Sequence, residues 1–126
     1  RTVPCEDRVI LENTLKLEAV LGGAVSANQP EAHVDFVSWN VDGLTTKPAS
    51  VRAALNSTTD VTILAAPTIQ GVIREPIHIS IYNKDTANVS VTVKTDDGTT
   101  ERIEVRHTLA TLESLVWDKG VGWYVI

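Results

Sequence analysis

The sequence predicts an all-β fold, an antiparallel β-sandwich or jelly-roll-like barrel of about eight short strands. Val, Ile and Thr make up about a third of the 126 residues, and these β-branched side chains fit a pleated sheet better than a helix. Short apolar stretches alternate with polar residues, and turn signals recur about every 8–12 residues. Strand–helix–strand alternation is missing from the sequence, which argues against a parallel α/β fold.

Length and cysteine content indicate one domain that needs no disulfide. A chain of 126 residues can bury enough apolar surface for a core, and its one cysteine, Cys5, cannot form an intrachain bridge. We expect a single β-domain over residues 1–126, with an N-terminal arm at 1–7. Residues 40–60 are expected to form a long loop, with one or two helical turns after Pro48.

The first half of the chain contains two expected strands. Residues 8–21 favour a strand because Leu15 and Leu17 alternate with charged residues before a Gly-Gly turn. Residues 32–39 follow, with one apolar face and an opposite face that carries His33, Asp35, Val37 and Trp39. Because that composition is unusual for a core, we expect this second face to meet a neighbouring subunit.

Four more strands are expected between residues 60 and 106. Residues 60–67 form one, and residues 72–83 form another in which isoleucines alternate with polar side chains. Pro76 within the second predicts an edge position or a bulge there. Residues 88–106 predict a β-hairpin with one buried face, because two alternating stretches flank Asp97-Gly98.

The C-terminal part closes the predicted fold. Residues 115–117 and 123–126 are expected strands on either side of a tight turn, so Trp117 and Trp123 are expected to pair across it. His107 follows two apolar residues of the hairpin, and we expect it at the margin of the core.

Charge and hydropathy argue against two classes of partner. The formal net charge is −5 and no two lysines or arginines are adjacent, so the chain lacks the basic patch that nucleic acids require. No apolar stretch approaches the roughly 20 residues needed to span a bilayer. We therefore expect neither a nucleic-acid nor a membrane partner.

Signatures of catalysis and metal binding are missing from the sequence. His33, His78 and His107 stand in none of the common zinc spacings, and the serines lack a nucleophile-elbow setting. His33 and Asp35 could supply two ligands from one strand face, but two ligands do not complete a site. We expect a protein that is not an enzyme and that uses no metal or other cofactor.

Several short motifs follow one another along the chain. They are "KLEAVLGGAVSANQ" at 16–29, "TILAAP" at 62–67, "IYNKD" at 81–85, "VTV" at 91–93, "LATLESLVW" at 109–117 and "GWYV" at 122–125. In this order they resemble the small virion proteins of tailed bacteriophages, and the resemblance covers residues 14–39 and 58–126. The chain departs from that pattern at Leu112, where a glycine is usual in the turn, and at Trp117, where a tyrosine is usual.

The resemblance implies a structural part of a phage particle, on the outer surface of the capsid or tail. The expected function is that of a capsid decoration, or cement, protein that bridges neighbouring capsid subunits. Its expected partners are the major capsid protein and copies of itself in a homotrimer. The alternatives are a tail adaptor, fibre or spike component and, from another class, a carbohydrate-binding adhesin module. The candidate partner contacts are Val3, Cys5, His33, Trp39, Pro48, Val51 and Leu55.

Overall fold

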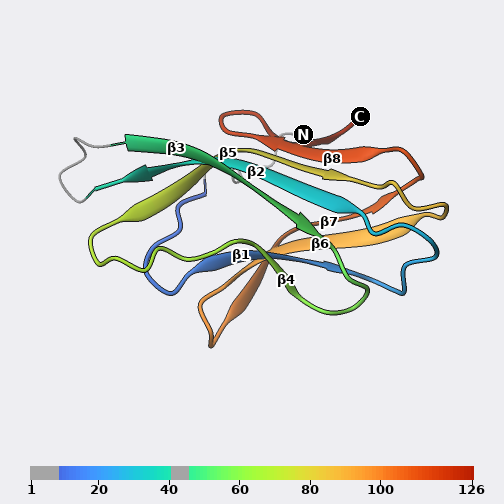
Figure 1. Cartoon of the computed structure of the whole chain (residues 1–126), viewed down its shortest axis with the longest axis horizontal. Helices are drawn as coiled ribbons and strands as arrows, with labels where there is room; N and C mark the ends of the chain where they lie inside the picture. The colour runs from blue at the N-terminus through green and yellow to red at the C-terminus, as the bar shows by residue number, and fades with distance from the viewer. Residues whose placement is uncertain (1–8, 41–45) are drawn as a thin grey trace.

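Apolar residues at every second position build two antiparallel β-sheets that pack face to face as a β-sandwich (Figure 1). The computed structural model describes residues 9–40 and 46–126 and confirms the all-β prediction. Over these residues there are nine strands, close to the expected number. In the same part of the chain, no helix is long and apolar enough to cross a membrane.

The first sheet has four strands in the order β4-β1-β6-β7. Its strands are β1 (Lys16–Leu21), β4 (Val61–Leu64), β6 (Val89–Asp96) and β7 (Glu101–Leu109). The valines of β6 face the core, and the polar residues between them face outward. The predicted hairpin at 88–106 is confirmed as β6 and β7.

The second sheet has five strands in the order β3-β2-β5-β8-β9. Its strands are β2 (Glu31–Trp39), β3 (Thr46–Ala54), β5 (Ile73–Tyr82), β8 (Ser114–Asp118) and β9 (Gly122–Val125). In β2, Val34 and Phe36 are buried, so His33 and Asp35 point to the outer face as predicted.

The core lies between the sheets and is built from both of them. Leu17 and Val91 from the first sheet and Ile79 from the second are fully buried within it. Trp117 is fully buried and pairs with Trp123 across the β8–β9 turn, with ring centroids 6.4 Å apart. This cross-strand pair confirms the prediction for the C-terminal strands.

The expectation of a long loop at 40–60 with helical turns is wrong over much of its length. Strand β3 occupies Thr46–Ala54 and pairs with β2 along all nine of its residues. Pro48 is compatible with this strand because β3 lies at the edge of its sheet, where proline is tolerated.

Bulges in β5 and β7 change which side chains are buried. Where β2 pairs with β5, Asp35 of β2 faces His78 and Phe36 of β2 faces Pro76. Ile77 is therefore the extra residue in β5. The bulge alternative for Pro76 is therefore confirmed, and the edge alternative is wrong because β5 is central. In β7 a second register shift leaves Ile103 57% exposed. His107 is also exposed, so its expected place at the core margin is wrong.

Candidate functional site

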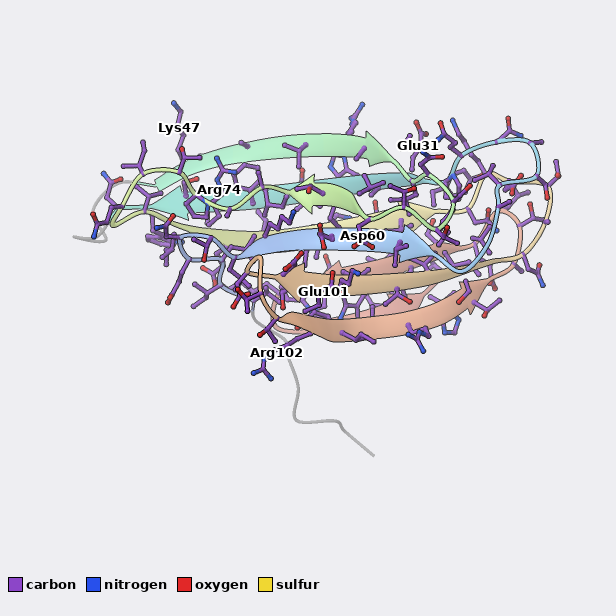
Figure 2. The ribbon with its side chains drawn as sticks, turned by 90° about the horizontal axis from the view of Figure 1, so that it is seen from below. Glu31, Lys47, Asp60, Arg74, Glu101 and Arg102 are labelled. Carbon is purple, nitrogen blue, oxygen red and sulfur yellow. The ribbon has the colours of Figure 1, made fainter. Side chains whose placement is uncertain are left out.

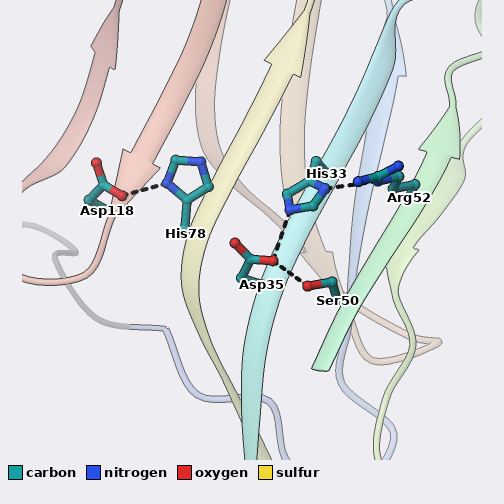
Figure 3. Close-up of polar contacts among 6 residues, drawn as sticks. All are labelled: His33, Asp35, Ser50, Arg52, His78 and Asp118. Carbon is teal, nitrogen blue, oxygen red and sulfur yellow. Dashed lines mark hydrogen bonds and ion pairs between the residues drawn. The ribbon is translucent and has the colours of Figure 1, made fainter. Parts of the chain in front are cut away.

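Six polar side chains meet on the outer face of the five-stranded sheet (Figure 3). We call this group the histidine face, and it consists of His33, Asp35, Ser50, Arg52, His78 and Asp118. Strand register brings them together, because residues directly opposite on neighbouring strands point to the same side. His33 faces Arg52 and Asp35 faces Ser50 across β2 and β3, while His78 faces Asp118 across β5 and β8.

His33 is held from both sides of its ring. Arg52 donates a hydrogen bond from Nε to Nδ1 of His33 at 3.2 Å, so Nδ1 must carry a lone pair. The opposite nitrogen, Nε2, lies 2.8 Å from Oδ1 of Asp35 and therefore donates to it. Ser50 donates its hydroxyl to the same oxygen of Asp35. These contacts correspond to the imidazole tautomer that carries its proton on Nε2.

A second histidine–aspartate pair lies beside the first. Nδ1 of His78 is 2.6 Å from Oδ1 of Asp118, and the hydroxyl of Tyr124 donates to Oδ2 of Asp118 at 2.5 Å. The rings of His33 and His78 meet edge to face, with centroids 6.4 Å apart and planes inclined by 62°. The polar network therefore extends across all five strands, from β3 to β9.

Hydrogen bonding keeps both aspartates of this face ionised. The hydrogen bond from Ser50, together with that from His33, lowers the pKa of Asp35. The hydrogen bonds from Tyr124 and His78 likewise lower the pKa of Asp118. Each carboxylate thus presents a fixed negative charge beside a histidine, in a position held by neighbouring strands.

The hydrogen-bond pattern differs from that of a nucleophilic active site. In a serine hydrolase the hydroxyl donates to a histidine that removes its proton. Here Ser50 donates to Asp35 instead, and the histidine ring that contacts Asp35 has its other nitrogen occupied by Arg52. A surface hollow of about 250 Å³ lies beside this network, lined by Glu31, Ala32, His33, Arg52, Ser80 and Tyr82.

The structure places the candidate partner contacts in different environments. His33 lies on the outer face of β2, and Pro48 is exposed on β3 opposite Val37. Trp39, at the end of β2, is partly buried, and its indole nitrogen is inaccessible to solvent. Val3 and Cys5 lie outside the described residues.

Two of the candidates belong to the core rather than to the surface. Leu55 is 0% exposed, and Val51 packs against the core with its side chain partly buried. The expectation that Leu55 contacts a partner is therefore wrong. Val51 turns inward because β3 has one face against the other sheet, a pattern that a loop would not impose. Leu55 directly follows the end of β3, and its amide donates a hydrogen bond to the carbonyl of Pro30 at 2.8 Å.

Most residues of the histidine face could not be assigned to one site from the sequence. Ser50, Arg52, His78 and Asp118 come from three strands, and only their register places them beside His33 and Asp35. The one signal in the sequence was the alternation at 72–83, which put His78 on the polar side of its strand.

The chain matches no protein-family model, no curated protein and no solved structure. We therefore infer its function from the residues and contacts described above, together with the order of its motifs.

Proposed function

We propose that the protein is a non-enzymatic structural component of a bacteriophage virion. In this proposal it is a capsid decoration protein on the outer surface of the particle. It bridges neighbouring subunits of the major capsid protein and assembles with copies of itself into a homotrimer. The histidine face makes the contact with a partner subunit, and the resemblance of the motifs to small virion proteins supports this choice of partner.

The composition of the histidine face is the observation that carries the proposal. Arg52 is exposed on it, and Tyr82 and Tyr124 flank it with 37% and 39% of their surface exposed. Arginine and tyrosine are enriched at protein–protein interfaces, where they supply much of the binding energy. A flat sheet face that presents these residues suits contact with another protein surface.

Pre-ordering of the side chains adds to this argument. Asp35 accepts hydrogen bonds from His33 and Ser50. Asp118 accepts them from His78 and from Tyr124 beside the face, so both histidines are held in place. Docking of a partner on the face therefore costs little additional side-chain entropy. The same bonds engage the groups that would act as base or nucleophile in an enzyme, which favours a binding function over catalysis.

Bridging suits a stiff sandwich that makes several modest contacts. Pressure from packaged DNA pulls neighbouring capsid subunits apart, and a rigid body fixed to two of them opposes that motion. Simultaneous contacts give an avidity that exceeds the affinity of each contact alone. Among the described residues β3 is an edge strand that pairs with β2 alone, and trimer assembly would cover such an edge.

Binding to shells tests the proposal directly. Purified protein is mixed with empty shells assembled from the major capsid protein encoded in the same genome, and pelleting and the melting temperature of the shells are measured. We expect saturable binding that raises the melting temperature. Arg52→Ala is expected to weaken binding at least about tenfold, or about 1.4 kcal/mol, because arginine is enriched among the interface residues that dominate binding energy.

A matched control is available on the opposite sheet. Arg106 is also exposed and also donates one side-chain hydrogen bond, to Thr92 at 3.1 Å. Arg106→Ala is expected to bind shells as the wild type does. Absence of shell binding by the wild type, or equal binding by the two variants, would contradict the proposal.

The rival functions give different results in other assays. A tail adaptor, fibre or spike component would be located on the tail in an electron-microscopy reconstruction. A carbohydrate-binding module would give sugar-specific binding on a glycan array that Trp39→Ala removes. The buried indole nitrogen of Trp39 and the full burial of Trp117 make an open aromatic platform a weaker explanation of these tryptophans.

A further inference from the structure

A group of carboxylates gathers on the outer face of the other, four-stranded sheet. Glu18 on β1, Asp96 on β6 and Glu101 on β7 each offer an oxygen within 4.8 Å of the others. Asp96 faces Glu101 on β7 and Lys16 on β1, and Glu18 lies two residues after Lys16, on the same side of β1. We call Glu18, Asp96 and Glu101 the carboxylate cluster.

Two lysines offset only part of the negative charge around this cluster. Nζ of Lys94 lies 2.9 Å from Oε2 of Glu101 and 2.9 Å from Oδ1 of Asp60, and Figure 2 places these two acids near each other on this sheet. Nζ of Lys16 lies 3.1 Å from Oε2 of Glu18. With Asp60, four carboxylates meet two ammonium groups, so the surroundings keep an excess of negative charge.

Glu18 provides an independent reason to expect a ligand. It is only 4% exposed, and its Oε1 is buried with no hydrogen-bond partner among the residues that the structure describes. Leaving a buried carboxylate oxygen unsatisfied is costly. A positive group bound at Oε1 would remove the penalty.

We propose that the carboxylate cluster binds a divalent cation, and that Ca²⁺ fits it best. Hard cations prefer carboxylate oxygens, and Ca²⁺ bonds of roughly 2.3–2.6 Å allow two oxygens almost 5 Å apart to share one ion. Mg²⁺ requires shorter bonds in a strict octahedron, which three carboxylates on a sheet surface suit less well. Glu101 can offer Oε1 to the cation while its Oε2 stays with Lys94.

The bound cation would stabilise the four-stranded sheet. It would join β1, β6 and β7, which supply one ligand each, across two strand pairings. Because the ion binds the folded chain and not the unfolded one, stability rises with ion concentration. This effect is independent of any partner on the histidine face.

Two measurements on the chelator-treated full chain test the site. The first is calorimetric titration with CaCl₂, and the second is the melting temperature of the protein at increasing CaCl₂ concentrations. We expect one Ca²⁺ per chain and a saturable rise in melting temperature, with weaker binding of MgCl₂. Glu18→Gln and Glu101→Gln are each expected to weaken Ca²⁺ binding at least about tenfold, because each removes a charged ligand.

Controls separate a specific site from general charge effects. Glu101 is exposed, so Glu101→Gln is expected to fold even if the buried Glu18→Gln does not. Asp118→Asn alters a carboxylate on the other sheet and is expected to bind Ca²⁺ as the wild type does. Absence of Ca²⁺ binding by the wild type would overturn the proposal, as would Glu101→Gln binding with undiminished affinity.

Discussion

The backbone amide of Ala27 donates a hydrogen bond of 2.8 Å to Oδ1 of Asp85, 58 residues further along the chain. The amides of Ser26 and Asn28 donate to the same carboxylate at 2.9 and 3.1 Å, and Asp85 is almost fully buried. One side chain therefore joins the loop between β1 and β2 to the loop between β5 and β6.

Acid unfolding should depend on Asp85. Hydrogen bonds from backbone amides, led by that of Ser26, lower the pKa of Asp85 from its ordinary 3.8 to about 2. Because the folded pKa is the lower one, the stabilisation is complete above about pH 4 and is lost as the pH falls towards 2. We expect Asp85→Asn to lower the melting temperature by several degrees at pH 7.

The pH dependence itself is the sharper readout of that variant. Free energies of unfolding from urea titrations between pH 2 and 7 should fall less steeply with acid in Asp85→Asn than in the wild type. Glu12→Gln removes an exposed carboxyl and serves as the control. An Asp85→Asn curve parallel to that of the wild type would contradict this account of the two loops.

Leu112 occupies a backbone conformation that favours glycine. Its φ is 67°, its side chain is exposed, and its amide donates to the carbonyl of Asn83 at 2.7 Å. Leu112→Gly keeps that amide and removes the steric cost of the left-handed region, so we expect a gain of roughly 0.5–1 kcal/mol. Leu112→Ala retains a Cβ and should give no gain. Equal unfolding midpoints in urea for the two variants would argue against strain at this turn.

The hydrogen bond from Ser50 should control the charge of Asp35. It is the largest influence that lowers the pKa of Asp35, so Ser50→Ala is expected to raise that pKa. The carboxyl carbon of Asp35 can be followed by NMR as the pH is changed. Ser80→Ala removes a hydroxyl from the neighbouring strand and is expected to leave Asp35 unchanged. An equal rise in both variants would show that Ser50 has no specific effect.

Substitutions at Leu55 and Pro48 should separate core from surface. Leu55 is fully buried, so Leu55→Ala is expected to cost about 2–5 kcal/mol of the free energy of unfolding. Pro48 is exposed on the edge strand, and Pro48→Ala is expected to change that energy by no more than about 0.5 kcal/mol. Urea denaturation measures both. A cost below about 1 kcal/mol for Leu55→Ala would be incompatible with its place in the core.

Local alternation predicted the strands that have one clearly apolar face. The valines of β6 and the isoleucines at 79 and 81 of β5 follow that pattern, and the structure buries them. Strand β3 was not predicted from the sequence because its edge position allows Pro48 and its inward residues include small alanines. A short apolar side chain gives little contrast with its polar neighbours, so no period of two stands out.

The bulges and the site depend on pairing between distant strands. The extra residue at Ile77 was indicated by Pro76, but no comparable signal marks the shift beside Ile103. His33 and Asp35 were recognised because they share a strand. Arg52 and Asp118 come from strands whose neighbours only the complete topology defines. The contact of Glu18 with Asp96 and Glu101 could not be predicted for the same reason, because it too depends on the pairing of distant strands.

A reconstruction of shells decorated with the purified protein tests the central claim most directly. The account predicts density for the sandwich on the outer surface, across the seams between capsid subunits, with the histidine face against the shell. Density that places the four-stranded sheet against the shell, or the absence of any added density at saturating protein, would contradict it.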